Sequence, residues 1–318
     1  MILEISKSLI ELITKGDEKG RLCILNYHRV LDKSDPFREG DVDIETFRWH
    51  MMLLKKYFNV LPLIDAVGLL SKGELPSRAV CITFDDGYAD NERNALPILS
   101  QLDISATFFI STAYLDKGCM WNDIIIESVH RSKNSNIDLS EIDLGVFPII
   151  STEQKKQAVV SILNSLKYLN QPLRQEKANY IGGMVGGTPN NLMLSSSQVK
   201  KLHASGMGIG SHTVTHPILK NISTKDAQQE ITQSKRILEN MVNDQVSLFA
   251  YPNGYPGKDY TAEHARMVKD AGYVAAVTTQ WGVSNCKSDF WQLPRFRPWN
   301  TNKEKYMLNL LRNYFRQV

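Results

Sequence analysis

Two adjacent carboxylates at the end of an apolar run are the first residues of this sequence whose types suggest chemistry. Val80 to Phe84 carries β-branched and aromatic side chains without polar alternation, which predicts a strand covered on both faces. Asp85 and Asp86 follow, and Gly87 can turn the chain because glycine adopts positive φ without steric cost. Two like charges at the end of a buried strand are hard to ionise unless a cation compensates them. The pattern predicts a positive partner, although an Asp-Gly turn with Asp86 capping the next helix would also explain it.

Two histidines four positions apart form the second group. His212 and His216 follow a glycine-punctuated run over residues 206–210, and this spacing places both imidazoles on one side of a helical turn. Pro217 disfavours the helical region for His216, so the turn ends there. A histidine pair joined by a carboxylate from elsewhere supplies three protein ligands and leaves an open position, as in catalytic zinc sites. We therefore expect a metal centre on a short turn after a strand.

These residues resemble a known family. Residues 83–87 (TFDDG) and 211–216 (SHTVTH) resemble the first two motifs of the NodB-homology polysaccharide deacetylases, which form carbohydrate esterase family four. Residues 106–110 resemble the strand after the first motif, and residues 249–254 occupy the position of the third motif. The resemblance covers roughly residues 22 to 298, apart from a long insertion.

The resemblance implies hydrolysis of an acetamide on an N-acetylated amino sugar in a polysaccharide or glycan precursor. One divalent cation would be held by Asp86, His212 and His216 and would polarise the amide carbonyl. Asp85 would not be a ligand and would instead take a proton from the attacking water. We expect Zn²⁺ first, with Ni²⁺, Co²⁺ or Fe²⁺ as alternatives, because this ligand set tolerates several divalent ions.

The proton donor and the oxyanion contact are implied by the same resemblance. His28 ends the first expected core strand, and a polar residue there could serve an active site or bind its own loop. In the permuted-motif branch of the family, an early Tyr-His pair takes over from the late motif that supplies the general acid, which makes His28 the candidate proton donor. The backbone N–H of Asn253, where many relatives have tyrosine, would meet the oxyanion.

An arginine is missing from its usual place in the third motif. The segment begins with Phe249 and Ala250, where relatives bring an arginine that orients the base. Arg295 could substitute for it through two hydrogen bonds to Asp85. The alternative is that Arg295 or Arg297 pairs with a structural carboxylate.

Three other functions remain as alternatives. An esterase acting on O-acetyl sugars would use the same residues. A non-haem iron oxygenase also uses two histidines and one carboxylate, but it would not explain Asp85 beside the ligand, and an all-β cupin would not show this strand–helix alternation. An inactive carbohydrate-binding protein is disfavoured because both aspartates and both histidines are present.

Alternating strand and helix patterns predict a distorted or incomplete (β/α) barrel that forms a single domain over residues 1–318. The alternation lapses over approximately residues 113–194, where polar runs separate helical segments such as 158–169, and we expect an inserted helical subdomain or lid there. Residues 2–15 have the spacing of an amphipathic helix that docks on the barrel, on a second subunit or weakly on a membrane surface.

Composition excludes several classes of protein. The chain has 318 residues, 42% hydrophobic and 22% charged, and its formal net charge of +3 with no basic cluster argues against a nucleic-acid partner. Four scattered cysteines argue against a disulfide framework. The start of the sequence does not resemble a secretory signal and no run is long enough to span a membrane, so we expect a cytoplasmic protein with a carbohydrate substrate.

Overall fold

The computed structural model describes the chain except for residues 1–9, 11–19, 117, 185–190 and 317–318. The amphipathic helix expected over residues 2–15 therefore falls outside the described residues, apart from Ile10, which is buried. No helix of the described part combines the length and the apolar composition that crossing a membrane requires.

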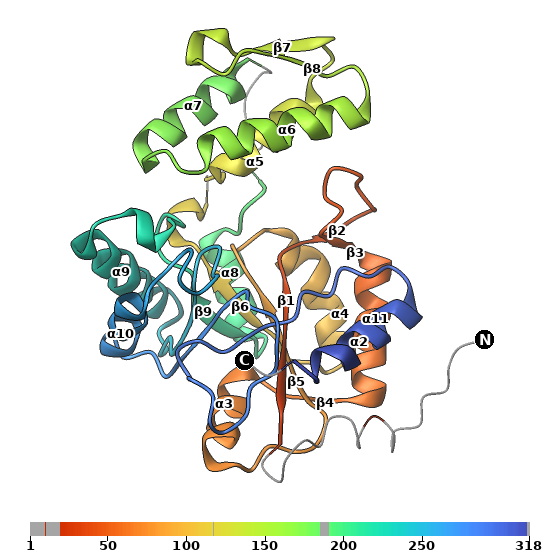
Figure 1. Ribbon diagram of the computed structural model, residues 1–318. Coiled ribbons are helices and arrows are strands. Elements are labelled where there is room, and N and C mark those ends of the chain that lie inside the picture. The colour runs from red at the N-terminus through yellow and green to blue at the C-terminus, as the bar shows by residue number, and fades with distance from the viewer. Residues whose placement is uncertain (1–9, 11–19, 117, 185–190, 317–318) are drawn as a thin grey trace.

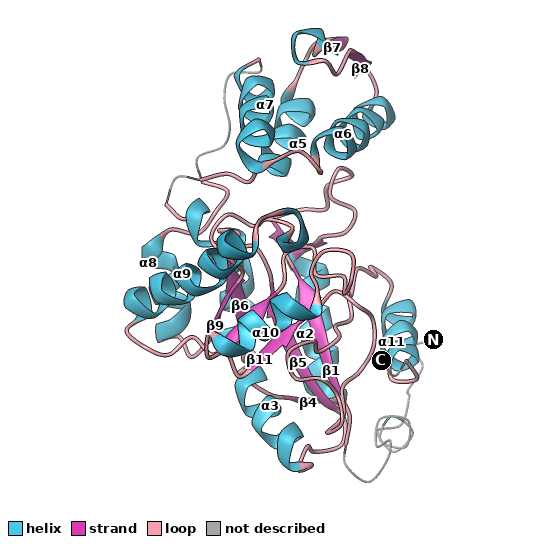
Figure 2. Ribbon diagram, turned by 60° about the vertical axis from the view of Figure 1, so that its left-hand side comes forward, coloured by secondary structure: helices cyan, strands magenta, loops and turns pink. Residues whose placement is uncertain are grey.

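A curled parallel sheet forms the centre of the molecule (Figure 2). Most residues of its strands are buried, and the strand over residues 79–84 is buried throughout, as its unbroken apolar run predicts. In spatial order they are β1 (Leu22–Tyr27), β5 (Ala79–Phe84), β6 (Thr107–Ile110), β9 (Gly208–Ser211), β10 (Leu248–Ala250) and β11 (Ala275–Val277), with β4 (Asn59–Val60) paired to the first residues of β5. A second, two-stranded parallel pair is β2 (Val30–Leu31) with β3 (Val42–Asp43).

A late segment of the chain lies between the two ends of this sheet. Leu293 forms a parallel bridge with Val277 of β11, and Phe296 forms one with Leu25 of β1. The N–H of Phe296 donates to the carbonyl of Ile24 at 2.8 Å, which ties the segment to β1. The sheet is thus a partly closed ring of parallel strands with helices around it, and the predicted distorted or incomplete (β/α) barrel is confirmed.

Helices connect the strands and cover the sheet (Figure 1). They are α2 (Ile44–Tyr57), α3 (Leu63–Lys72), a π-helix (Asn91–Ala95) leading into α4 (Leu96–Gln101), α8 (Ser196–Ala204), α9 (Thr224–Val242), α10 (Ala262–Asp270) and α11 (Lys303–Asn313), with 3₁₀ turns at Thr112–Tyr114, Ser140–Ile142 and Leu219–Asn221. Ser223 caps α9 by accepting a hydrogen bond from the N–H of Asp226.

The segment between β6 and α8 has a hydrophobic core of its own. It contains α5 (Trp121–Arg131), α6 (Thr152–Leu166) and α7 (Gln171–Gly183). It also contains an antiparallel hairpin, β7 (Asn136–Asp138) with β8 (Val146–Pro148), that the sequence did not predict. The buried residues of these elements pack against one another, for example Ile125, Ile162 and Ile181. Figure 1 shows this segment standing beyond one end of the central strands. We call it the inserted segment and propose that it is the subdomain expected over residues 113–194.

Candidate active site

The polar residues that end the central strands meet in one cavity. His28 comes directly after β1, Asp85 and Asp86 after β5, and His212 after β9, so all of them lie at the carboxyl end of the parallel strands. The cavity has a volume of about 500 Å³. Its lining consists of Asn26, His28, Asp85, Asp86, His212, His216, Asn253, Thr279, Trp281, Arg295, Arg297 and Trp299.

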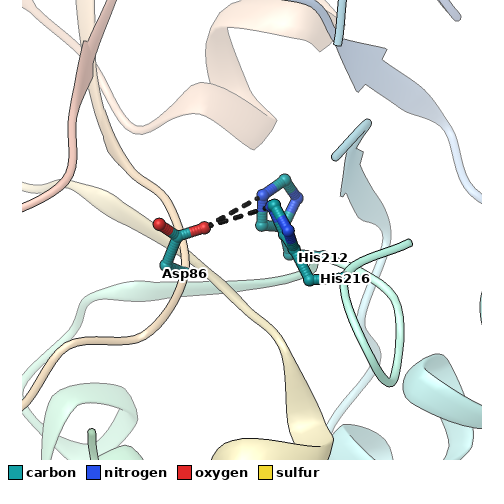
Figure 3. A group of neighbouring side chains, drawn as sticks. All are labelled: Asp86, His212 and His216. Carbon is teal, nitrogen blue, oxygen red and sulfur yellow. Dashed lines mark ion pairs between the residues drawn. The ribbon is translucent and has the colours of Figure 1, made fainter. Parts of the chain in front are cut away.

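Three side chains in this cavity converge as metal ligands would (Figure 3). Oδ1 of Asp86 lies 3.4 Å from Nε2 of His212 and 3.4 Å from Nε2 of His216. The candidate ligand atoms of the three residues all lie within 4.8 Å of one another. A tetrahedral site with bonds of about 2.1 Å separates its ligand atoms by about 3.4 Å, so the two Asp86 distances suit a zinc-sized cation.

The imidazole of His212 has a defined tautomer. Its Nδ1 lies 2.7 Å from the carbonyl oxygen of Ala250, and a carbonyl can only accept a hydrogen bond. Nδ1 therefore donates this bond, so in the neutral ring the lone pair lies on Nε2 and faces Asp86, where it can bind a cation. Burial disfavours protonation of His212, but the charges of Asp85 and Asp86 outweigh it and raise the pKa of His212. Burial lowers the pKa of His216 to about 4, so that imidazole is neutral near pH 7.

A glutamate from α9 holds the turn that carries both histidines. Glu230 accepts hydrogen bonds from the N–H of Val214 at 2.7 Å, the N–H of Thr215 at 2.8 Å and the hydroxyl of Thr215 at 2.7 Å. His216 has a φ of 53°, a left-handed conformation that L-residues avoid unless their surroundings hold them. No motif marks Glu230 in the sequence, because its partners are groups on another element.

Asp85 forms a bidentate salt bridge with Arg295. The two side chains form two hydrogen bonds, of 2.8 and 2.6 Å, and both are almost completely buried. Arg295 also donates to the carbonyl of Thr278 at 2.8 Å and to the hydroxyl of Thr83 at 3.1 Å, which fixes its plane. Burial disfavours ionisation of Asp85, but Arg295 and His212 outweigh it and hold the pKa of Asp85 below its ordinary value.

His28 lines the same cavity and has an unpaired ring nitrogen. Within the described part of the chain, its buried Nδ1 has no hydrogen-bond partner, so the ring is not bonded to its own loop through that atom. Burial, followed by the nearby charge of Arg297, lowers the pKa of His28. The carbonyl of His28 accepts a hydrogen bond from Asn91 at 2.8 Å, which anchors the backbone but leaves the ring free.

The backbone N–H of Asn253 is a candidate hydrogen-bond donor in the cavity. Asn253 has a φ of 59°, and its carbonyl accepts from the hydroxyl of Thr279 at 2.6 Å. No acceptor among the described residues takes the N–H of Asn253, and the residue lines the cavity. An unpaired N–H beside candidate metal ligands is a suitable contact for an oxyanion.

Several residues of the cavity wall were not selected in the sequence. Asn26 is 3% exposed and its Oδ1 has no partner among the described residues. A polar residue inside the apolar run of β1 is the signal that could have identified it. Trp281 and Trp299 lie with ring centroids 5.2 Å apart on the same wall, and Arg297 completes it.

The chain is similar to known proteins over most of its length. The sequence model of a family described as polysaccharide deacetylase matches residues 72–276. YxkH of Bacillus subtilis (strain 168), a protein named by inference as a polysaccharide deacetylase, is 24% identical over 285 residues, which are 89% of this chain and 73% of YxkH.

A second curated relative matches a shorter stretch. The poly-β-1,6-N-acetyl-D-glucosamine N-deacetylase of Staphylococcus epidermidis is 32% identical over 112 residues, 31% of this chain and 38% of the relative. Among solved structures, the Streptococcus pyogenes deacetylase PplD in complex with acetate superposes with a TM-score of 0.61 at 20% identity, covering 92% of this chain and 98% of PplD. IcaB of Ammonifex degensii superposes with a TM-score of 0.55 at 16% identity, covering 91% and 95% of the two chains. Both superpositions show the same fold.

Proposed function

Because this chain belongs to the polysaccharide deacetylase family and is therefore a carbohydrate deacetylase, we propose that it removes N-acetyl groups from an amino sugar in a polysaccharide or glycan precursor with the help of one divalent cation. One observation carries the proposal: the convergence of Asp86, His212 and His216 next to Asp85 in a single cavity. These three residues would hold the cation, and Zn²⁺ suits their nitrogen and oxygen donors and their spacing.

The bound cation and the Asp85–Arg295 pair would promote the attack of water on the amide. A cation bound by these ligands supplies Lewis acidity that polarises the acetamide carbonyl. Asp85 stays ionised because its pKa is held low, and it accepts the proton of the attacking water. Arg295 keeps the carboxylate of Asp85 in one plane through two hydrogen bonds, so the accepting oxygen does not have to be reoriented during the reaction.

The other side of the cavity serves the tetrahedral intermediate and the leaving group. The N–H of Asn253 donates a hydrogen bond to the oxygen that becomes negative when water adds to the carbonyl. His28 in its protonated form, which its lowered pKa makes the minor form near pH 7, gives a proton to the departing amine nitrogen, so that the C–N bond breaks to release acetate and a free amino sugar. The unpaired Nδ1 of His28 agrees with this role, because no described residue competes for the ring at that atom.

The cavity wall and one relative support an amide substrate on a sugar. Trp281 and Trp299 provide flat apolar faces of the kind that stack on sugar rings. The S. epidermidis relative is named for N-deacetylation of a polymer of N-acetylglucosamine. We therefore place glycans that contain N-acetylhexosamine first among the substrates.

The proposal is tested by measuring two products at once. Purified protein is stripped of metal, reloaded with Zn²⁺, Co²⁺ or Ni²⁺, and incubated with N-acetylglucosamine oligomers and with O-acetylated sugars of matched length. We expect equal amounts of acetate and free amine from the N-acetylated oligomers, and neither product after chelation. Acetate from the O-acetylated sugars alone would make the protein an esterase and overturn the proposal.

A further inference from the structure

The loop that presents Asp86 has a strained backbone. Asp86 and Gly87 both have positive φ, 76° and 87°. An aspartate in this left-handed region is disfavoured and persists only where the surrounding structure holds it. On the amino side, the N–H of Asp85 donates to the carbonyl of Tyr27 at 3.0 Å, which ties the start of the loop to β1. On the carboxyl side, the carbonyl of Asp86 accepts a long hydrogen bond of 3.4 Å from the N–H of Ser111, and Gly87 and the residues after it supply further restraint.

Residues 87–89 are hydrogen-bonded to the end of the inserted segment. The N–H of Leu194 donates to the carbonyl of Gly87 at 2.9 Å, and the N–H of Ala89 donates to the carbonyl of Leu192 at 2.8 Å. Tyr88, between these bonds, is almost completely buried. The chain that returns from the inserted segment therefore runs directly beside the metal loop.

The side chain of Tyr88 reaches the inserted segment a second time. Its hydroxyl donates to Oδ2 of Asp123 at 2.9 Å, and Asp123 lies on α5 with no exposed surface. Arg38 donates to Oδ1 of the same carboxylate at 3.1 Å and to Oε1 of Glu127, one turn further along α5, at 2.9 Å. Arg29 lies 5.0 Å from the centre of the Tyr88 ring and pairs with Asp90 at 2.7 Å.

These contacts fix Tyr88 more strictly than packing alone. Burial raises the pKa of Asp123, but Arg38 opposes this and favours the charged form, which accepts from two donors at once. Hydrogen bonds to a buried carboxylate are directional and are lost completely if a partner moves away. A buried ion pair such as Arg38–Asp123 contributes little net stability compared with apolar residues in the same place. Its main effect here is therefore to fix the position of the Tyr88 side chain.

We propose that Asp123 is a positioning residue for the metal loop: through the hydroxyl of Tyr88 it holds the strained turn that presents Asp86, and the inserted segment is part of the framework of the metal centre. The inference rests on the metal centre of the proposed function. The inserted segment would then contribute to metal affinity, which a segment that only covers the cavity would not do.

Packing provides the competing explanation. Tyr88 belongs to a small buried cluster with Tyr114, Met120, Leu192 and Met193. If this cluster alone held the loop, the hydroxyl of Tyr88 would be dispensable. Tyr88→Phe separates the two explanations, because it keeps the ring in the cluster and under Arg29 and removes only the hydrogen bond to Asp123.

The test measures metal affinity of the full chain directly. Metal-free wild type, Tyr88→Phe, Asp123→Asn and the double variant are titrated with Zn²⁺ by isothermal titration calorimetry, and kcat and KM are measured on the reloaded proteins. We expect each single change to weaken zinc affinity about ten-fold or more, the size seen when outer hydrogen-bond partners of metal ligands are lost. The double variant should bind zinc no more weakly than Asp123→Asn alone, because Tyr88→Phe removes only the bond to Asp123 that Asp123→Asn already disrupts. The loss of activity should appear in kcat and leave KM unchanged.

Glu127→Gln is the matched control. It removes a charged partner of Arg38 on the same helix without touching Tyr88, and should leave zinc affinity within about two-fold of wild type. Wild-type affinity in Tyr88→Phe, or additive losses in the double variant, would overturn the inference while the proposed function stands. A wild-type protein that binds no divalent ion would overturn both. Circular dichroism checks folding, and Tyr88→Phe alone decides the outcome if Asp123→Asn does not fold.

Discussion

Asp85 and Asp86 are neighbours in sequence with different environments. Asp86 faces two imidazole nitrogens, whereas Asp85 faces a guanidinium. The same side-chain chemistry can therefore serve as ligand in one position and as base in the next. The role of each residue is set by the partner that the fold brings to it.

Substitutions at these residues should separate metal binding from turnover. Asp85→Asn should keep the cation and lower kcat by roughly 10²–10⁴-fold, the usual contribution of a general base. His212→Ala and Asp86→Ala should lose both the cation and the activity, because each removes one of three ligands. Metal content by mass spectrometry and acetate release, measured on the same samples, check this. Near-normal turnover in Asp85→Asn would show that another group accepts the proton.

The Arg295–Asp85 pair should control the acid side of the pH profile. The folded-state pKa of Asp85 lies below its ordinary value of about 3.9, so the pair stabilises the fold above that pH and this contribution is lost as the pH falls through the lower value. Arg295→Gln removes the positive charge of the guanidinium group beside Asp85. The pKa of Asp85 should therefore rise, and the acid limb of kcat/KM should move to higher pH. Breaking a buried pair should also cost about 3–5 kcal/mol in the free energy of unfolding.

Arg297→Gln is the control for this stability effect. Arg297 is two residues away and partly exposed, and its nearest carboxylate, on Asp41, lies 4.0 Å away. The free energy of unfolding of the Arg297→Gln variant should differ from that of wild type by about 0.5 kcal/mol or less. Urea denaturation at pH 7 and rate profiles between pH 4 and about 9 compare the two variants. An unchanged acid limb in Arg297→Gln and in Arg295→Gln alike would exclude Asp85 as the titrating group.

At the scale of elements, α9 supports the histidine turn from behind. Its Glu230 satisfies two backbone donors and one hydroxyl of that turn. The helix and its cap at Ser223 depend on residues that are neighbours in the chain. That local pattern does not indicate that one acidic residue on the helix faces inward to a loop.

Glu230→Gln should weaken metal binding more than it weakens the fold. A glutamine keeps a single acceptor oxygen, so at least one donor of Val214 or Thr215 loses its charged partner, which is worth about 1.5–3 kcal/mol. The histidine turn then becomes less ordered, and zinc affinity should fall by about ten-fold. Calorimetric titration with Zn²⁺ measures the affinity, and Gln233→Ala on the exposed side of α9 serves as the control. Equal affinity in both variants would show that Glu230 is not needed for the turn.

His50 lies on the buried face of α2 and packs in the core. His50 is fully buried, and its Nε2 donates to the carbonyl of Asn300 at 2.9 Å. In the neutral ring Nδ1 therefore accepts from the hydroxyl of Tyr27 at 3.0 Å, and the ring stacks on Tyr306 with centroids 4.0 Å apart. Burial lowers its pKa to about 3, so it is neutral at physiological pH.

At the scale of the whole molecule, the last helix packs against the beginning of the barrel. Tyr306 of α11 stacks on His50 of α2, and the hydroxyl of Tyr314 donates to the carbonyl of Ala79 in β5 at 3.1 Å. These contacts join parts of the chain more than 200 residues apart. They hold in place the segment that brings Arg295 to Asp85.

Loss of this packing should destabilise the whole domain. Tyr306→Ala removes a fully buried ring and should cost about 3–5 kcal/mol, whereas Leu308→Ala on the same helix removes a side chain that is 47% exposed and should cost about 0.5 kcal/mol or less. Urea denaturation monitored by circular dichroism gives both values. Similar values for the two variants would show that α11 does not pack on the barrel in solution.

The residues that we propose to carry the chemistry could be selected before the fold was known. Asp85, Asp86, His212 and His216 lie in two short motifs, and the strand that precedes the two aspartates shows an apolar run of the right length. Such signals are local, since they depend on residue types within a few positions of one another. For the same reason the alternation of strands and helices was sufficient to predict an incomplete barrel.

The partners of these residues depend on contacts between distant parts of the chain. Arg295 reaches Asp85, 210 positions earlier, because residues 293–296 lie between β11 and β1. Glu230 and Asp123 act on loops that belong to other elements. No spacing in the sequence encodes such contacts, because side chains from separate elements meet only after the strands pair and the helices pack. The catalytic residue types are thus a local property of this chain, and their orientation is a property of the closed barrel.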